Sequence, residues 1–567
     1  MSDRDRLNVV LCWHMHQPEY RDLISGDFRL PWTYLHTIKD YVDMVAHLEA
    51  VPEARAVCNF TPLLLEQIND YAAQVDGFLN NGMAIRDPVL AALETPSLSV
   101  DPDQRIALVK ACLRANQERV VQRFPPYKRL AAVARSVIEH PDMLQYVTNQ
   151  YLSDLVVWYH LAWLGETVRR SDPVAGRLIS QGSGFTLHDR RELLKVIGDL
   201  ISGVLPRYRH LAQQGQIELS MSPYGHPIVP LMLSFDAARE AMPDVHLPHL
   251  EHYPGGMERV QWHLHKGLDV FQKSFGMIPI GCWPSEGGVS QDSLGLFSGA
   301  GFRWIATGGA VLNHSASHQT ALQGANPSVH TGHRDSATGL HVFFRDDGLS
   351  DSIGFEYAKW DTEDAISNLM HHLETIAGAT SDRSGSMAAI IMDGENAWEY
   401  YQENAHGFLS KLYQNLVDHS KLRLTTFSEW IAQGYESEAL SPIVAGSWVY
   451  GTFSTWIGNE DKNRAWEMLG DAKRVYDVVV KSGRISSEQR ERIDRQLAIC
   501  EGSDWFWWFG DYNPAETVAQ FDQLFRGHLA NLYQLLGEDP PEYLTTSFAH
   551  GRGAPALGGV MRPSRLQ

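Results

Sequence analysis

Short apolar runs alternate with longer amphipathic segments over the first three quarters of the chain. Several of these runs lack the alternation of polar and apolar positions seen in half-buried strands, as expected of parallel strands covered on both faces. Helical patterns such as residues 33–50 and 365–378 lie between them. The repeat of strand and helix predicts an α/β fold, specifically an incomplete (β/α)7 barrel. The seven predicted strands cover residues 8–13, 56–60, 216–222, 278–283, 303–307, 341–346 and 387–393.

Two regions depart from this repeat. Residues 61–215 contain several helical patterns and are too long for a simple connection, so they predict a helical insertion over one end of the barrel. After residue 430 the pattern is helical throughout, and Ser486 and Gln489 are spaced for a capping box. We therefore predict a barrel domain over 1–430 with the insertion at about 61–215. A C-terminal helical bundle over 431–545 and a flexible Gly/Pro-rich tail over 546–567 follow.

Composition and charge limit the classes of partner. The 567 residues are 44% hydrophobic and 20% charged, and the formal net charge is −20. Such an acidic surface repels phosphate backbones and anionic lipids, which argues against nucleic acid and membrane partners. A neutral or cationic small molecule remains as the expected ligand. The sequence does not fix the oligomeric state.

The termini and cysteines bear on the compartment. The N-terminal segment "MSDRDRLN" is charged and has no apolar core of signal-peptide type, and no uninterrupted apolar run approaches 18 residues. The five cysteines are odd in number, scattered and without a CxxC pair, and three of them fall in apolar strand-like runs. These features predict a reduced, cytoplasmic protein.

Residues with chemical content follow the predicted strands. In β/α barrels the active site is built where strands end, on the C-terminal face. The run "IIMD" places Asp393 just past four apolar residues, where desolvation raises the pKa of a carboxyl group and lets it act as an acid near neutral pH. The residues at the strand ends are His14, His16, Asn59, Glu218, His226, Trp283, Glu286, Arg345, Asp346, Asp393 and Glu395.

Two carboxylates and two aromatic residues stand out in this set. Glu286 and Asp393 are accompanied by Trp283 and Trp398. A sugar-cleaving site needs one carboxyl group to protonate the leaving oxygen and another near the anomeric carbon, with flat rings against the apolar faces of the sugars. Either acid taken alone could equally be a structural cap or a member of an ion pair. The combination favours a glycosidase.

Six motifs occur in series and together resemble glycoside hydrolase family 57. They span residues 8 to about 530, nearly the whole chain. The resemblance implies a (β/α)7 barrel with a helical bundle that acts on α-glucans and retains the anomeric configuration. The motifs are "WHMHQP", "NFTPLLLEQI", "GQIELSMSPYGHPIVPLM", "CWPSEGGVS", "IIMDGENAWEYY" and "EGSDWFWWFGD".

The resemblance also implies roles for individual residues. The family's nucleophile falls on Glu286 and its general acid/base on Asp393, and a retaining pair of carboxyls is about 5–5.5 Å apart. The family's HQP motif falls on His16, Gln17 and Pro18, and His14 is a further histidine of the first sugar subsite. We predict that the substrate-binding residues are His14, His16, Gln17, Glu218, His226, Trp283, Arg345, Trp398 and Trp505.

Three questions stay open at this point. "DGENAWEYY" and "WPSEGGVS" resemble amylase-like and amylopullulanase-like members, but the second differs from the loop of the best-known amylopullulanases. Preference for α-1,4 over α-1,6 bonds is therefore unresolved, and 4-α-glucanotransferase or branching activity is an alternative. The aromatic segment 503–511 could line the glucan cleft or pack the bundle on the barrel, or do both through different rings.

Two alternative hypotheses are a metal-dependent amidohydrolase and a non-catalytic glucan-binding barrel. His14 and His16 have the HxH spacing that opens the amidohydrolase metal set. That set also needs Lys or His after the fourth strand and histidines after the next two, where this chain has Glu286, Thr307 and Arg345. We therefore predict no metal and no cofactor. The presence of both carboxylates argues against a barrel without catalysis.

Overall fold

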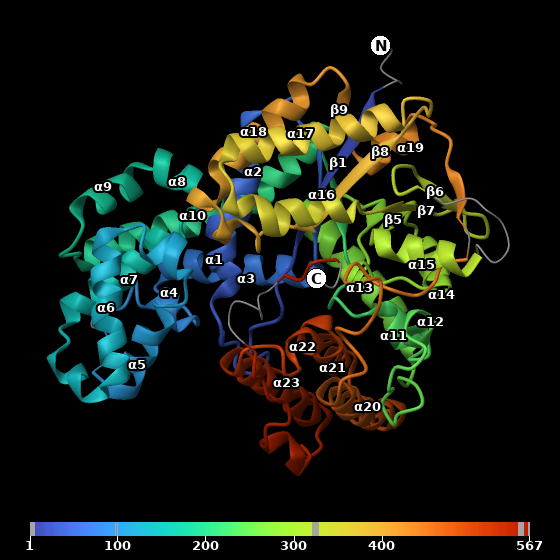
Figure 1. Ribbon diagram of the computed structural model, residues 1–567. Coiled ribbons are helices and arrows are strands. Elements are labelled where there is room, and N and C mark those ends of the chain that lie inside the picture. The colour runs from blue at the N-terminus through green and yellow to red at the C-terminus, as the bar shows by residue number, and fades with distance from the viewer. Residues whose placement is uncertain are drawn as a thin grey trace.

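The seven predicted strands lie in one curled, mostly parallel sheet (Figure 1). The computed structural model describes residues 6–96, 98, 100–319, 328–440, 442–553 and 561–564. The sheet order is β10-β6-β7-β5-β4-β3-β2-β1-β8, and β9 pairs with the start of β1. The predicted α/β class and incomplete barrel are confirmed. The strands matching the prediction are β1 Leu7–Met15, β2 Ala56–Phe60, β3 Ile217–Met221, β4 Gly281–Cys282, β5 Trp304–Thr307, β7 His341–Phe344 and β8 Met387–Asp393.

Strand β1 explains why the sequence pattern was apolar without alternation. All nine residues of β1 are buried, and the strand pairs in parallel with β2 and β8. Because both faces and both edges are covered, no position of β1 is left to water. The sheet also curls back on itself, since the Asp346 N–H after β7 donates to Ala389 O of β8 at 2.8 Å.

Three short strands were not predicted, and one predicted strand is shorter than expected. β6 His333–Asp335, β9 Leu422–Leu424 and β10 Glu438–Leu440 have three residues each, too few to show a periodic pattern. β4 has two residues where a run over 278–283 was predicted. Its Gly281 lies directly under the ring of Trp304, where an added Cβ would be 1.9 Å from the nearest ring atom.

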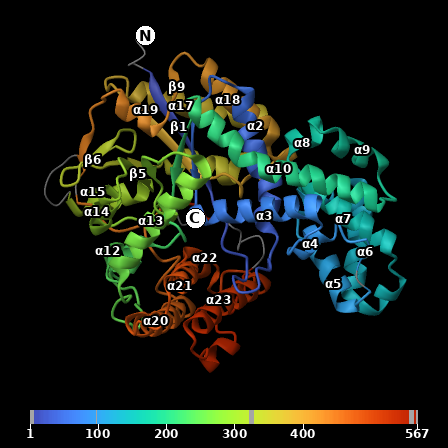
Figure 2. The ribbon, with the colours of Figure 1, turned by 180° about the vertical axis from the view of Figure 1, so that it is seen from behind.

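The long connection between β2 and β3 is helical, and its middle part forms a lobe to one side of the sheet in both views (Figures 1 and 2). Its last helix, α10, begins with a capping box formed by Thr186 and Asp189. The helices are α3 Pro62–Asn81, α4 Pro88–Ala91, α5 Pro102–Ala111, α6 Pro125–Glu139, α7 Asn149–Trp163, α8 Glu166–Ser171, α9 Pro173–Gln181 and α10 Leu187–Gln213.

Other helices cover the outside of the curled sheet. They connect successive strands, as the strand–helix repeat predicted. The covering helices are α1 Trp32–His36, α2 Val42–Ala50, α11 Val229–Leu233, α12 Ala237–Ala241, α13 Gly256–Phe275, α14 Gln291–Gly299, α15 Gly309–Gln319, α16 Asp347–Asp351, α17 Thr362–Ala379, α18 His406–Asp418 and α19 Phe427–Ala432.

Four further helices follow near the C-terminus and pack together below the sheet in Figure 1. They are α20 Glu460–Lys481, α21 Ser487–Cys500, α22 Ser503–Trp508 and α23 Ala515–Leu536. The predicted capping box of Ser486 and Gln489 is confirmed at the start of α21.

The domain boundaries at residues 430 and 545 stay a prediction. Within the predicted tail, Ser564 donates from its N–H and its hydroxyl to Asp351 at 2.8 and 2.7 Å. The Arg562 guanidinium lies 4.1 Å from the centroid of the Tyr512 ring. Residues 554–560 and 565–567 of that tail lie outside the described residues.

The described residues contain neither a membrane-spanning helix nor a disulfide. In the described part of the chain, no helix is both long and apolar enough to cross a bilayer. The five cysteines are buried and form no disulfides. The cytoplasmic location stays a prediction.

A buried charged group joins the four C-terminal helices to the barrel. Glu501, between α21 and α22, accepts from Arg259 and His263 of α13, each at 2.8 Å, and from the Tyr253 hydroxyl at 2.6 Å. Burial alone would raise the pKa of Glu501, but the Arg259 charge and the His263 bond lower it to about 2. Glu501 is therefore ionised at neutral pH and holds the segment that leads into α22.

We expect Glu501→Gln to lower the free energy of unfolding by about 3–5 kcal/mol, because it leaves the Arg259 charge buried without its partner. Urea-induced unfolding followed by circular dichroism measures this. Glu538→Gln is the control, since Glu538 pairs with Arg484 on the surface and such pairs contribute about 0–1 kcal/mol. Equal unfolding midpoints for the two variants would contradict the assignment.

Candidate active site

The parallel register brings chemical groups from distant parts of the chain to one end of the sheet. His14 of β1 is level with Asn59 of β2 on one side and with Asp393 of β8 on the other. Glu286 lies in the loop after β4. His14, His16, Gln17, Glu286 and Asp393 all line one cavity of about 570 Å³. The structure thus places both predicted catalytic carboxyls and three predicted binding residues together.

Glu286 has an unusual backbone conformation. Its φ of 57° lies in the left-handed region, where a side chain with a Cβ costs about 1–3 kcal/mol. Its Oε2 accepts from Trp448 Nε1 at 3.0 Å, and its Oε1 accepts from the Ser503 hydroxyl at 3.2 Å. The local strain and the two donors fix the direction of the Glu286 carboxyl group.

Asp393 ends β8 opposite His14. Its Oδ2 accepts from Asn396 Nδ2 at 2.9 Å. Burial raises the pKa of Asp393. Burial also raises the pKa of Glu286 to about 8, and the negative charge of Asp393 contributes to that rise.

These two carboxyl groups titrate as a pair, because each ionised form disfavours ionisation of the other. Because the pKa of Glu286 is raised to about 8, the pair still holds a proton at neutral pH. One protonated acid beside one carboxylate is the state needed for proton donation and nucleophilic attack in the same cavity.

Glu395 supports the segment that carries His16 and Gln17. Its Oε1 accepts from the His16 N–H at 3.1 Å and from Gln17 Nε2 at 3.3 Å. Burial raises the pKa of Glu395 well above its usual range, and the charge of Asp393 adds to the effect. Glu395 therefore positions the start of the HQP segment.

Three histidine rings are stacked at the bottom of this site. The ring centroids of His16 and His226 are 4.0 Å apart, and those of His14 and His226 are 5.1 Å apart. His14 Nδ1 donates to Asn59 Oδ1 at 2.8 Å, because an amide oxygen can only accept, and the same oxygen lies 3.0 Å from the Ser222 hydroxyl. In the described structure His14 Nε2 is buried without a partner. It can accept a hydrogen bond from a ligand hydroxyl.

His16 carries the positive charge of the group. Its Nδ1 lies 3.1 Å from the Thr61 hydroxyl, and its Nε2 lies 2.7 Å from Asp504 Oδ1. Burial opposes the charge, but Asp504, Glu286 and Asp393 together outweigh it and raise the pKa of His16. Burial lowers the pKa of His14 to about 3 and the pKa of His226 well below its usual value, so those two rings are neutral.

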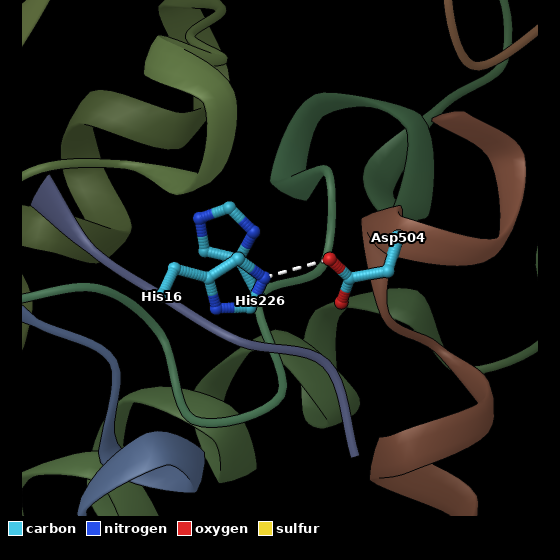
Figure 3. A group of neighbouring side chains, drawn as sticks. All are labelled: His16, His226 and Asp504. Carbon is cyan, nitrogen blue, oxygen red and sulfur yellow. Dashed lines mark hydrogen bonds and ion pairs between the residues drawn. The ribbon is translucent and has the colours of Figure 1, made fainter. Parts of the chain in front are cut away.

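His16, His226 and Asp504 bring three possible metal-ligating atoms within 4.8 Å of one another (Figure 3). Imidazole binds a metal through a lone pair in its ring plane, at about 2.0–2.1 Å for Zn²⁺. The stacked rings of His16 and His226 are inclined by only 27°, so their lone pairs do not converge on one ion. His16 Nε2 is already bonded to Asp504. The geometry fits an ion pair better than a metal centre.

The other predicted binding residues do not line this cavity in the described structure. Glu218 bonds Trp304 and Ser428 inside the barrel. Arg345 pairs with Asp347 and Asp351 at 2.9 and 2.8 Å. Both side chains are occupied by structural contacts.

The predicted tryptophans are buried behind the cavity wall. Trp283 packs edge-on against Trp448, with ring centroids 5.3 Å apart, and so supports a donor to Glu286. Trp398 packs on Trp13 and donates to Gly394 O. Trp505 packs inside the helical bundle against Phe525 and His528.

A different set of aromatic residues lines the cavity. Trp507 and Trp508 lie in the segment that the sequence singled out, but the turn of α22 directs Trp505 into the bundle and these two toward the cavity. Trp32 and Trp163 form another wall, with ring centroids 5.9 Å apart. Segment 503–511 thus does both through different rings, as one of the open alternatives had it. No sequence signal distinguished Trp32 and Trp163 from core residues. The residues of the cavity wall that the prediction did not name include Trp32, His36, Trp163, Glu399, Tyr400, Trp448 and Asp504.

Comparisons with known proteins were made for sequence and for structure. Residues 10–443 match the family model described as Glycosyl hydrolase family 57. The search of curated proteins gave no match. A branching enzyme of the GH57 type from Pyrococcus horikoshii is similar at 14% identity and a TM-score of 0.56, over 99% of this chain and 100% of that one.

Two further solved structures are similar at comparable levels. The α-amylase of Thermotoga maritima has 14% identity and a TM-score of 0.55, over 97% of this chain and 95% of its own. The 4-α-glucanotransferase of Thermococcus litoralis has 13% identity and a TM-score of 0.51, over 93% of this chain and 60% of its own. At these identities the similarity shows the fold alone.

We expect the purified protein to retain only substoichiometric Zn²⁺ after dialysis, and EDTA to leave its melting temperature unchanged, because the histidine lone pairs do not converge. Elemental analysis and differential scanning fluorimetry measure both. A stoichiometric metal that is retained by the wild type and lost in His226→Ala would contradict the ion-pair interpretation.

Proposed function

The chain belongs to glycosyl hydrolase family 57, and we propose that it cleaves glucosidic bonds of α-glucans with retention of configuration. The observation that carries the proposal is the pair of buried carboxyl groups, Glu286 and Asp393, in one cavity with aromatic walls. The solved structures with the same fold include enzymes named as an α-amylase, a branching enzyme and a 4-α-glucanotransferase.

In the proposed first step, protonated Asp393 donates its proton to the glycosidic oxygen while Glu286 attacks C1. The bond from C1 to the leaving oxygen breaks, and an ester between the sugar and Glu286 forms. In the second step Asp393 removes a proton from water, which attacks C1 and releases Glu286. General acid and base assistance of this kind contributes roughly 10²–10⁴-fold to the rate.

In this proposal His14 contributes a hydrogen-bond acceptor for a sugar hydroxyl, and His16 contributes a positive charge. His14 Nε2 is an acceptor without a partner in the described structure, so it can accept from a sugar hydroxyl. Protonated His16 places a positive charge near both carboxyl groups and lowers the pKa of each. That charge stabilises the carboxylate of Glu286 before its attack.

The aromatic walls favour a chain of sugars over a single one. Trp32 and Trp163 line one part of the cavity, and Trp507 and Trp508 line another. Flat rings pack against the apolar faces of pyranoses, and several rings along one cavity can contact successive sugar units. We propose α-1,4-linked chains as the substrate and hydrolysis as the main reaction, in keeping with the amylase-like form of "DGENAWEYY".

The product profile from amylose, pullulan and maltoheptaose tests this assignment. We expect shortened linear products from amylose. Proton NMR should show that their anomeric configuration is retained. Maltotriose released from pullulan would instead indicate α-1,6 cleavage. Products longer than maltoheptaose, or new branch points, would indicate that transfer replaces hydrolysis. Absence of cleavage of every α-glucan would overturn the proposal.

We expect Glu286→Gln to abolish turnover of amylose and of an aryl α-glucoside alike, since the nucleophile is needed for both. Asp393→Asn should lower the turnover of amylose by about 10²–10⁴-fold. It should lower the turnover of the aryl glucoside less, because that leaving group needs little protonation. Reducing-end and chromophore assays measure the two substrates. Melting temperatures and the remote variant Glu538→Gln control for folding. Substantial amylose turnover by Glu286→Gln would exclude it as nucleophile.

We expect kcat/KM to fall as pH rises above about 8. Burial and the charge of Asp393 raise the pKa of Glu286 to about 8, and because the two carboxyls are coupled we take this as the pH at which the pair loses its last proton. Above that pH both carboxyls are ionised, and no acid is left to protonate the leaving oxygen. A pH–rate profile on amylose measures this limb. A rate that stays constant up to pH 10 would show that the pair does not supply the proton.

A further inference from the structure

The short helix α22 enters the catalytic centre from the C-terminal bundle with its first two residues. Ser503 and Asp504 each bond a side chain that the barrel places at the active site. Neither residue was predicted from the sequence to act there, and neither is a member of the carboxyl pair. The contact of Ser503 is with Glu286, and the contact of Asp504 is with His16.

Ser503 links Glu286 to His226. Its hydroxyl donates to Glu286 Oε1 at 3.2 Å and lies 2.9 Å from His226 Nδ1, which therefore donates to it. The Ser503 N–H donates to His226 O at 2.9 Å. Ser503 is fully buried. A hydrogen bond to the carboxylate that is fixed in this way restricts Glu286 to one orientation.

Asp504 acts on His16. Its Oδ1 lies 2.7 Å from His16 Nε2, and the two side chains are only 12% and 11% exposed. The charged groups that face His16 are Asp504, Glu286 and Asp393. The neutral rings of His14 and His226 stack near it, and Glu395 accepts from its backbone N–H.

The charge on His16 lowers the pKa of Glu286 by more than Asp504 itself raises it. Keeping His16 protonated therefore favours an ionised Glu286. The charge and the hydrogen bond of Asp504 are the largest contributions that oppose burial at His16, so the pKa of His16 falls when Asp504 is removed. Asp504 acts directly to raise the pKa of Glu286, and its opposite effect, which favours the ionised nucleophile, passes through His16.

Contacts at both ends hold α22 in this place. Before the helix, Gly502 lies so close to the barrel that an added Cβ would be 2.9 Å from Gly225 O, and the preceding Glu501 pairs with Arg259. After the helix begins, buried Lys462 donates to Phe506 O at 2.6 Å. The helix is therefore fixed to the barrel and to α20 at once.

We propose that Ser503 and Asp504 are positioning residues, through which the C-terminal bundle orients Glu286 and keeps His16 charged, so that the barrel alone is not a competent catalyst. The inference rests on the proposed function, because it assigns a role toward the nucleophile named there. It extends that function by making the bundle part of the catalytic machinery and not only a wall of the cleft.

The test compares Ser503→Ala and Asp504→Asn with matched variants elsewhere. Ser315→Ala removes another buried serine hydroxyl with two backbone bonds, and Asp511→Asn removes an exposed carboxylate three residues after α22. We expect kcat on amylose to fall on the order of 10- to 100-fold in Ser503→Ala and Asp504→Asn, the range expected for a hydrogen bond to a charged group. KM should change little in Ser503→Ala, because that residue does not line the cavity. Both controls should keep the wild-type kcat.

The pH profile separates positioning from a merely structural role. In Asp504→Asn the acidic limb of kcat/KM should move to higher pH, since Glu286 loses the neighbouring charge of His16, and Asp504→Glu should restore part of the shift. A fall by the same factor at every pH, or no fall in either variant, would overturn the proposal. If Asp504→Asn melts at a lower temperature, Ser503→Ala still decides. Wild-type protein without glucan turnover would instead refute the proposed function.

Discussion

Two carboxyl groups buried in one cavity repel each other when both are ionised, and the rest of the site is arranged around that constraint. Burial raises the pKa of both Glu286 and Asp393, and with the charge of Asp393 it raises that of Glu286 to about 8, so the pair holds a proton near neutral pH. The remaining negative charge is compensated by donors from Trp448 and Ser503 and by the protonated ring of His16. A buried charge without such partners would cost several kcal/mol, so the donors and the cation are conditions for the pair to exist.

The partners of the pair come from different parts of the fold. The register of β1 with β2 and β8 sets His14 beside Asn59 and Asp393, and parallel pairing makes this outcome unavoidable once the strands are in place. Ser503 and Asp504 are supplied by α22, more than 200 residues after Glu286. The segment that leads into α22 is held against the barrel by Glu501, which is buried against Arg259 and His263 of α13. The contacts that hold the bundle on the barrel therefore also set the positions of Ser503 and Asp504 at the site.

The aromatic residues show how a side chain's direction decides its role. Trp505, Trp507 and Trp508 are neighbours in sequence, yet Trp505 packs in the bundle and the other two line the cavity. Trp283 does not reach the cavity but supports Trp448, whose indole N–H bonds Glu286. Arg345 follows β7 as the predicted site residues follow their strands, and Glu218 lies near the start of β3, but structural partners occupy both side chains. A position at the end of a strand is thus insufficient to identify a binding residue.

The sequence by itself determined the strand–helix repeat, the seven main strands and the presence of Glu286 and Asp393 at strand ends, because apolar periodicity and local motifs are encoded in neighbouring residues. The short strands β6, β9 and β10 were missed because three residues carry no period. Only the tertiary structure decided which tryptophans face the cavity, that the stacked His16 and His226 rings form no convergent metal site, and that Asp504 pairs with His16 across 488 positions. Those contacts depend on long-range packing and helix rotation, to which no local pattern corresponds.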